Sequence, residues 1–317
     1  MEFDLIERIR QRTASHRDDV RLGIGDDAAV VAVPSGRELA IAVDTLVEGI
    51  HFPVGTAPAD IGWKALAVNL SDLAAMGATP AWALLALTLP TQDEAFIDGL
   101  AQGFAELATP FRLALIGGDT TRGPLTVTVA VHGFTAPEEA LLRSTARVGD
   151  VVMVTGTLGD AAAGLRCLAE ADPSPYGELI GRLNRPTPRV SAGQALRGIA
   201  TACIDVSDGL VADLGHICAQ SGVGAEIDAA LLPRSSAMLT HFHDADAIDF
   251  ALGGGDDYEL CFTVSAERAG DLAADLARLG CGATRIGRVV EGQGVRVIGL
   301  DGEALVPSRA GWNHFTA

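Results

Sequence analysis

Short runs of apolar residues alternate along this chain with longer segments whose apolar residues recur every three or four positions. Runs of the first kind predict strands, and segments of the second kind predict helices. The predicted strands are 28–33, 39–43, 81–89, 113–116, 125–134, 151–155, 200–204, 250–252 and 283–290. The predicted helices are a short one from Phe3 that ends before Ser15, then 59–76, 93–108, 160–170, 189–198, one that begins near Gly209, and 266–279. This alternation in both halves predicts an α/β protein with two lobes.

A turn-rich, charged segment near the middle of the chain marks the expected domain boundary. At 317 residues the chain exceeds the size at which one hydrophobic core usually stops growing, so two domains are expected. Arg143, Arg147 and Asp150 lie in the segment between two predicted strands. We therefore place the boundary near Gly149, which gives α/β domains of residues 1–149 and 150–317.

The longest apolar region, residues 57–90, contains polar interruptions that argue against a membrane span. The interruptions are Asp60, Lys64, Asn69, Asp72 and Pro80. The region therefore fits a buried helix followed by a strand. Residues 1–4 are acidic and lack the basic and apolar parts of a secretory signal. We expect a cytoplasmic protein without a membrane partner.

The formal net charge of −18 limits the ligands that the chain can bind unaided. Such a charge argues against binding to nucleic acid or to anionic membrane surfaces. An anionic substrate would need metal ions as a bridge. Lys64 is the only lysine and is not part of a Gly-Lys-Ser/Thr sequence, so a P-loop is excluded.

The spacing of the cysteines predicts that they are core residues of a protein from a reducing compartment. They are widely spaced and never form Cys-x-x-Cys, so neither a zinc knuckle nor a disulfide framework is indicated. The five positions are Cys167, Cys203, Cys218, Cys261 and Cys281.

Six short segments combine acidic residues with glycine, serine, threonine or asparagine. They are 23–29, 43–45, 69–72, 117–121, 205–209 and 253–258. Each alone is compatible with a solvated turn or a helix cap. Their repetition indicates a common cause, and several Mg²⁺ ions bound to a triphosphate supply one, because Mg²⁺ prefers oxygen ligands and neutralises phosphate charge.

Three of these segments carry specific expectations. Asp44 is expected at the end of its strand, where ligands collect in α/β folds. A loop at 117–121 would let backbone approach a phosphate while Asp119 reaches a metal. A helix that begins near Gly209 would leave its N-terminal amides and Ser207 facing a phosphate, with an ordinary N-cap as the alternative.

Two weaker signals are given the simpler interpretation. The strand, glycine turn and helix around 156–160 lack the full Gly-x-Gly-x-x-Gly pattern, so nucleotide binding is not expected there. His241 and His243 have no clear third partner, so an exposed loop is preferred to a transition-metal site.

The sequence signals also include no clear pair of nucleophile and base. Transfer of a phosphoryl group to an alcohol would need such a base, because the hydroxyl must lose its proton. A phosphate acceptor has no such need, since a phosphomonoester with a second pKa of about 6 is largely anionic at neutral pH.

Taken in order, the motifs resemble those of the thiamine-monophosphate kinases. They are Gly-Ile-Gly-Asp-Asp-Ala at 23–28, Asp-Thr-Leu-Val-Glu-Gly-Ile-His-Phe at 44–52, Asn-Leu-Ser-Asp-Leu-Ala-Ala-Met-Gly-Ala at 69–78, Gly-Gly-Asp-Thr-Thr at 117–121, Asp-Val-Ser-Asp-Gly-Leu at 205–210 and Gly-Asp-Asp-Tyr-Glu-Leu at 255–260. The resemblance implies an aminoimidazole-ribonucleotide-synthetase-like fold and a homodimer joined through its N-terminal lobes. It also implies Mg²⁺-dependent, direct in-line transfer of the ATP γ-phosphoryl group to thiamine monophosphate, the last step towards thiamine diphosphate.

The same resemblance implies roles for individual residues, without a separate catalytic acid or base. Metal ligands are expected at Asp26, Asp44, Asp72, Asp119, Asp205 and Asp208. ATP contacts are expected at Gly118, Asp119, Arg143 and Ser207. Substrate contacts are expected at His51, Asp256 and Phe315, with Trp312 as the alternative C-terminal aromatic residue.

Two positions depart from the family pattern. Ala42 and Val43 stand where the family often has hydroxyl residues, so only backbone carbonyls could serve a metal there. Asp256 stands where the family usually has Glu, so its reach is one methylene shorter.

Other proteins with this fold fit less well. Selenophosphate synthetase needs an early reactive cysteine, whereas Cys167 is the first here, and the hydrogenase-maturation relatives end in cysteine, whereas this chain ends in Ala317. Aminoimidazole ribonucleotide synthetase matches the motifs less closely. A non-catalytic acidic metal-binding module would explain the charge but not the ordered Gly, Ser and Arg residues beside the acids.

Overall fold

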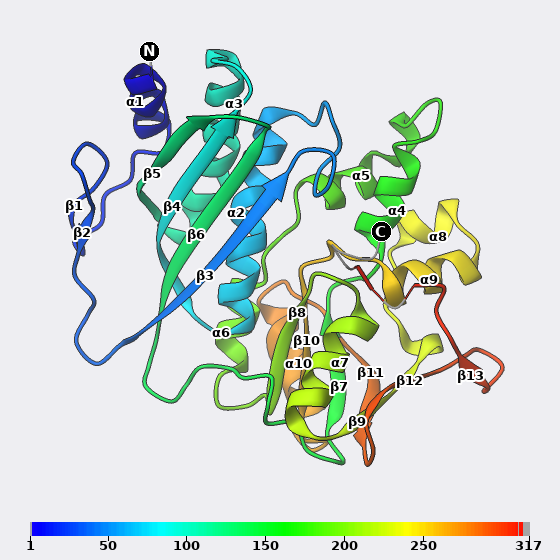
Figure 1. Cartoon of the computed structure of the whole chain (residues 1–317). Helices are drawn as coiled ribbons and strands as arrows, with labels where there is room; N and C mark the ends of the chain where they lie inside the picture. Colours follow the sequence, from blue (N-terminus) through cyan, green and yellow to red (C-terminus); the bar gives the residue numbers. More distant parts are fainter. Residues whose placement is uncertain (1, 310, 313–317) are drawn as a thin grey trace. The chain divides into compact units, whose positions relative to one another are not determined.

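The computed structural model describes residues 2–309, 311 and 312, and the chain divides into two compact units (Figure 1). Unit 1 comprises Met1–Leu73 and Ala78–Glu138, and unit 2 comprises Ala74–Gly77 and Glu139–Ala317. The segment 139–149 groups with unit 2, so the units divide before the boundary expected near Gly149. The reason is hydrogen bonding: the Leu142 carbonyl accepts the Cys203 N–H at 2.9 Å, and the Arg143 carbonyl accepts the Ser221 hydroxyl at 3.0 Å.

Unit 1 is built on a sheet that, in the described residues, has four strands in the order β3-β6-β4-β5. Strands β4 and β5 are parallel, and the other neighbours are antiparallel. The strands are β3 Glu38–Val47, β4 Thr79–Leu89, β5 Ala114–Arg122 and β6 Thr126–Thr135.

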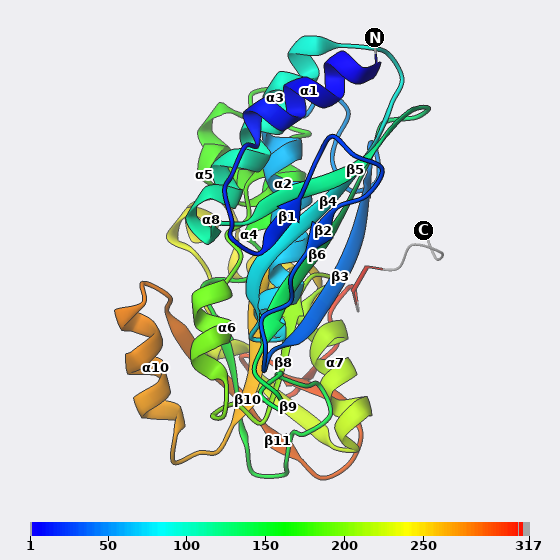
Figure 2. The same ribbon diagram turned by 90° about the vertical axis from the view of Figure 1, so that its left-hand side faces the viewer.

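Helices cover one face of this sheet (Figure 2). They are α2 Pro58–Ala75 and α3 Glu94–Ala108, with α1 Glu2–Arg12 packed on α3. Helices α2 and α3 cross closely at two glycines: a Cβ on Gly62 would lie 2.0 Å from the Leu100 carbonyl oxygen, and one on Gly103 would lie 1.8 Å from the Ala59 carbonyl oxygen. Glycine at these positions therefore allows the close helix packing.

The other face of the sheet is only partly covered. The hairpin of β1 Val20–Leu22 and β2 Val30–Val31 packs over a cluster that contains Trp82 and Phe134, whose rings meet edge to face at 5.1 Å. Ile41 and Val43 on β3 remain 62% and 61% exposed.

Unit 2 is built on a second sheet, with seven strands in the described part of the chain. Their order is β13-β12-β9-β11-β7-β10-β8, and within it β12 and β9 are parallel while the other pairs are antiparallel. The strands are β7 Val151–Thr155, β8 Ala202–Val206, β9 Gly224–Asp228, β10 Glu259–Val264, β11 Ala283–Val290, β12 Gly294–Ile298 and β13 Ala304–Leu305.

The helices of unit 2 lie on both sides of this sheet. Figure 2 shows α7 on one side and α6 and α10 on the other. Leu210, Leu214 and Ile217 of α7 pack into the core with the strands. The helices are α4 Asp160–Cys167, α5 Gly177–Asn184, α6 Val190–Leu196, α7 Leu210–Ser221, α8 Ser236–His241, α9 Asp244–Gly253 and α10 Ala269–Arg278.

Most predicted elements are confirmed, and four local predictions are wrong. Residues 117–121 lie in β5 and are not a loop, because they pair with β4. Asp44 lies inside β3, which continues to Val47 because β6 pairs with it to that point. Residues 250–252 end helix α9, whose apolar side joins the core, and of 28–33 only Val30 and Val31 form a strand.

The predictions that the apolar region forms a buried helix followed by a strand and that the cysteines are core residues are confirmed. Residues 57–90 contain α2 and β4, and in the described residues no helix is long and apolar enough to cross a membrane. All five cysteines are buried without a disulfide, and burial raises the pKa of each thiol.

Candidate functional site

The turn Ser207–Gly209 joins β8 to α7, and several hydrogen bonds hold its backbone. The Tyr258 N–H donates to the Val206 carbonyl and the Asp256 N–H donates to the Ser207 carbonyl, both at 2.8 Å. Asp205 lies within β8 and is 4% exposed, whereas Ser207 and Asp208 lie in the turn itself and are half-buried. Unit 2 therefore brings Asp205, Ser207 and Asp208 together, as predicted.

The carboxylate of Asp213 in α7 accepts hydrogen bonds from the backbone N–H groups of this turn. Its Oδ2 accepts the backbone N–H groups of Ser207, Asp208 and Gly209 at 3.0, 3.0 and 3.1 Å. The prediction that the amides near Gly209 face a phosphate is therefore wrong for these groups, because a carboxylate from the next helical turn already binds them. An Asp four residues into a helix after a glycine N-cap was the sequence signal for this contact.

The surroundings of Asp213 concentrate negative charge. Its pKa is raised to about 7, mainly by burial and further by the charges of Asp205 and Asp208, while the N–H groups of Asp208 and Gly209 oppose the rise. Three carboxyl groups thus repel one another around one turn. A divalent cation beside Asp205 and Asp208 would relieve this repulsion.

The predicted substrate residues of unit 2 also meet this turn. Asp256 has a left-handed backbone, with φ of 67°, and its Oδ1 accepts the Tyr258 hydroxyl at 2.8 Å. The backbone N–H of Trp312 donates to the Asp208 carbonyl at 2.9 Å, and Trp312 is 48% exposed. Phe315 lies outside the described residues.

Arg143 is the predicted ATP contact next to the same strand. It is exposed and directly follows Leu142, whose carbonyl binds the N–H of Cys203 in β8. Cys203 lies two residues before Asp205 in β8, so the backbone next to Arg143 lies beside the strand that leads into the Ser207–Gly209 turn.

In unit 1, Asn69 links α2 to Asp44. The Asn69 side chain accepts the Asp44 N–H at 3.0 Å and donates to the Ala65 carbonyl at 2.9 Å. Asp72 lies one helical turn after Asn69 and so shares its face of α2. The structure thus groups Asp44, Asn69 and Asp72.

Asp119 belongs to the opposite edge of the same sheet. It pairs with Ala86 of β4, and Gly118 pairs with Leu85. Leu85 in turn pairs with a residue of β6 that also pairs with Asp44 of β3. Three strand spacings separate β5 from β3, or about 14 Å.

Two further unit 1 residues were predicted in the site. Asp26 follows Gly25, whose φ of 128° favours glycine, in an exposed loop that passes beside Ile116 of β5. His51 accepts the Val47 N–H at Nδ1 at 2.9 Å, which leaves its neutral-form proton on Nε2, and its carbonyl accepts Lys64 Nζ at 3.1 Å. Gly118 has a packing role, since a Cβ there would lie 1.8 Å from the Leu85 carbonyl oxygen.

The candidate metal ligands suit a hard cation in chemical type. All are carboxylates, the donors that Mg²⁺ prefers. Among the described residues, however, His, Cys, Asp and Glu side chains do not gather in threes with a geometry that would hold an ion.

A buried ionic cluster beside β10 was not predicted from the sequence. Glu259 is fully buried and accepts hydrogen bonds from Arg182, Arg189 and the Thr155 hydroxyl. Next to it, both carboxylate oxygens of Asp257 accept the Gly159 N–H, at 3.0 and 2.8 Å. These contacts occupy the Gly159 N–H of the glycine turn at 156–160.

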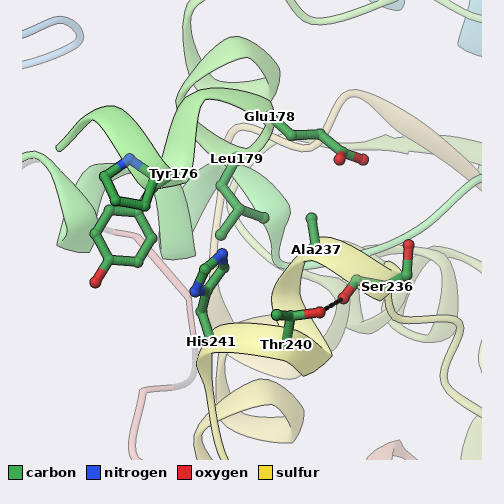
Figure 3. Close-up of a pocket in the computed structure, with 8 residues that line it drawn as sticks. Tyr176, Glu178, Leu179, Ser236, Ala237, Thr240 and His241 are labelled. Atoms are coloured by element: carbon green, nitrogen blue, oxygen red, sulfur yellow. Dashed lines mark hydrogen bonds between the residues drawn. The ribbon is translucent and has the colours of Figure 1, made fainter.

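Two cavities are lined by residues other than the predicted metal ligands. One of about 260 Å³ lies between α8 and the segment formed by the short 3₁₀ helix Ser174–Tyr176 and α5, where Tyr176 and Glu178 face Thr240 and His241 across it (Figure 3). The other, of about 620 Å³, is lined by Thr120, Thr121 and Arg122, directly after Asp119 in β5. His241 and His243 are exposed as predicted, although His241 ends α8 and is not in a loop.

Comparison with known families matches both halves of the chain. Residues 25–135 match the family described as AIR synthase related protein, N-terminal domain, and residues 147–299 match its C-terminal domain.

Individual proteins match over nearly the whole length. Thiamine-monophosphate kinase of Escherichia coli K12 is 50% identical over 319 residues, with 99% of this chain and 98% of the relative covered. The crystal structure of thiamine-monophosphate kinase from Stenotrophomonas maltophilia K279a has 52% identity and a TM-score of 0.88, with coverage of 96% and 98%. The structure of AaThiL complexed with AMPPCP and TMP has 34% identity and a TM-score of 0.78, with coverage of 99% and 97%.

Proposed function

The chain belongs to the thiamine-monophosphate kinase family, and from this premise we propose that it transfers the γ-phosphoryl group of ATP to thiamine monophosphate. The products are thiamine diphosphate and ADP. The observation that carries the proposal is the full-length similarity to AaThiL, which was solved with AMPPCP and TMP. No base is needed, because the attacking phosphate oxygen is already ionised, so direct in-line transfer is part of the proposal.

We assign Mg²⁺ to the carboxylates of both units. In unit 2 the gathering of Asp205, Asp208 and Asp213 around one turn favours a cation, because three acids close together are stabilised by a positive charge. When bound, Mg²⁺ would neutralise phosphate charge and orient the triphosphate. The proposed ligands are Asp205 and Asp208 in unit 2, and Asp26, Asp44, Asp72 and Asp119 in unit 1.

The remaining proposed contacts orient the two substrates. Arg143 and the Ser207 hydroxyl would bind ATP phosphate oxygens, with backbone near Gly118 and Asp119 as a further contact. The acid Asp256 and the exposed ring of Trp312 suit the cationic aromatic body of thiamine monophosphate. His51, and Phe315 at the C-terminus, complete the proposed acceptor contacts.

We propose that the enzyme is a cytoplasmic homodimer joined through unit 1. The support is a set of exposed apolar side chains in one sheet: Ile41 and Val43 on β3, and Leu84 on β4, with β6 between the two strands. The apolar region 57–90 is mostly core. Leu84 is its largest exposed apolar side chain.

The test is a coupled assay of ADP formation with ATP, MgCl₂ and thiamine monophosphate, together with chromatography of the thiamine products. ADP and thiamine diphosphate should form in equal amounts and only when thiamine monophosphate is present. ADP release that does not depend on this acceptor would contradict the proposal.

A further inference from the structure

Asp213 is the centre of the hydrogen bonds that shape the Ser207–Gly209 turn. One carboxylate oxygen accepts the three successive N–H groups of the turn, and the Asp213 N–H donates back to the Gly209 carbonyl at 3.0 Å. The side chain is 2% exposed. It therefore acts on the backbone of the turn and cannot reach a substrate.

The same turn holds the proposed acceptor residues through its carbonyl groups. Ser207 accepts the N–H of Asp256, and Asp208 accepts the N–H of Trp312. The N–H side of the turn thus binds Asp213, while its C=O side binds the segments that carry Asp256 and Trp312. A shift of this turn would move the proposed ATP and acceptor contacts of unit 2 together.

The turn contains a glycine in an unusual backbone conformation and packs closely against a neighbouring segment. Gly209 has φ of 125°, in the region that only glycine adopts easily, and glycine loses more conformational freedom on ordering than any other residue. The fit is also close, since a Cβ on Gly255 would lie 2.5 Å from the Ser207 carbonyl oxygen. Without Asp213, three N–H groups in a partly buried turn would lose their acceptor, which favours rearrangement.

We propose that Asp213 is a positioning residue, which holds Ser207 and Asp208 on the donor side and Asp256 and Trp312 on the acceptor side in one arrangement. This inference rests on the proposed function for the roles of the residues it positions.

A positioning role and a purely structural role predict different kinetics. If Asp213 only stabilises unit 2, its loss reduces the folded fraction, so apparent kcat falls while both KM values stay the same. If it positions the turn, the folded variant binds both substrates less well, so KM rises for ATP and for thiamine monophosphate.

The experiment compares Asp213→Ala and Asp213→Asn with Asp150→Ala. Asp150 is a matched control: it is a buried aspartate of unit 2 that accepts the Arg147 N–H and the Thr201 hydroxyl. Steady-state kinetics with each substrate varied, melting temperature, and calorimetric binding of Mg·AMPPCP are measured for each protein. The calorimetry keeps the inference testable if the wild-type chain binds this analogue but fails to transfer phosphate, which would overturn the proposed function alone.

Asp213→Ala should raise both KM values and the Kd for Mg·AMPPCP at least about tenfold. Asp213→Asn keeps a carbonyl oxygen as acceptor and should remain within about threefold of wild type. Asp150→Ala should lower the melting temperature and leave both KM values within about twofold. If Asp213→Ala does not fold, Asp213→Glu, whose longer side chain displaces the turn, should give the same pair of KM increases.

Either of two results would overturn the inference. One is a folded Asp213→Ala or Asp213→Glu variant with wild-type KM and Kd values. The other is an Asp213→Asn variant as impaired as Asp213→Ala, which would show that charge, and not the hydrogen-bonded turn, is what matters.

Discussion

At the scale of single residues, the aspartates of unit 2 differ in which of their atoms the fold uses. Asp213 uses its side chain to hold backbone, whereas Asp208 uses its backbone N–H and carbonyl for the fold. The side chain of Asp208 is therefore available for a ligand while its backbone stays fixed. A change confined to that carboxylate should test chemistry without disturbing structure.

Asp208→Asn should reduce kcat/KM by about a hundredfold or more, because a neutral amide keeps the shape but loses the charge that would bind Mg²⁺. Asp119→Asn should behave similarly. The melting temperature of both should stay close to wild type. Asp271→Asn, on the exposed surface of α10, is the control and should have wild-type activity. Near-normal turnover in both site variants would remove the metal-ligand assignment.

Tyr258→Phe and Asp256→Ala probe the acceptor contact. The Tyr258 hydroxyl donates to Asp256 at 2.8 Å, so its removal takes away one hydrogen bond that orients that carboxylate. Tyr258→Phe should raise KM for thiamine monophosphate by about three- to tenfold, and Asp256→Ala by more, with little change in KM for ATP. Kinetics with each substrate varied separately check this, and a rise in KM for ATP alone would show that the acceptor assignment is wrong.

At the scale of elements, one carboxylate ties the β1–β2 hairpin to the sheet of unit 1. Asp19 accepts two hydrogen bonds from Arg17, at 2.8 and 2.6 Å, and one from the Trp82 indole at 3.1 Å. The Arg17 hydrogen bonds are the main reason that the pKa of Asp19 lies below its ordinary value of 3.8, against the opposing effect of burial.

Asp19→Asn should lower the free energy of unfolding by about 1–2 kcal/mol at pH 7. Because the folded-state pKa is lowered, the contribution of Asp19 is fully present above pH 3.8 and is lost as the pH falls through the folded-state value. Urea unfolding at pH 7 and near pH 3 should therefore give a smaller difference between wild type and variant at the lower pH. An equal difference at both would exclude the ion pair as its source.

The exposed row on β3 allows a test of the proposed dimer. Ile41→Lys places a charge where apolar side chains would meet and should give a monomer at micromolar concentration in light scattering. Leu279→Lys is the control, because Leu279 is a similarly exposed apolar residue at the end of α10 in unit 2. A wild-type protein that is itself a monomer would contradict the dimer.

At the scale of the whole molecule, the net charge of −18 governs acceptor choice. A protein this acidic repels a free phosphate but attracts a cationic ring, so metal ions and acids must act on different parts of the substrate.

Thiamine monophosphate should be phosphorylated at least about a hundredfold better than thiamine, measured as kcat/KM. Thiamine lacks both the phosphate that Mg²⁺ would bind and the ionised oxygen that attacks. If thiamine proves the better acceptor, direct transfer to a phosphate oxygen is wrong.

The sequence alone determined the periodic elements and the order of the acidic motifs. Helix α2, strand β4 and the strand–turn–helix at 205–210 follow from local spacing, which residues within a few positions of one another impose. The motif order was enough to predict the family, because each motif is short and contiguous.

The tertiary structure decided which atoms those motifs leave for a ligand. Pairing with β4 makes a strand of residues 117–121, and Asp213 binds amides that the sequence had left open to phosphate. The backbone of Trp312, over a hundred positions from Asp208, bonds to the same turn. The strand pairing and the Trp312 contact depend on partners distant in sequence, so no local pattern of apolar and polar residues encodes them. The Asp213 contact spans only six residues, and its one local signal was the acid four residues into the helix.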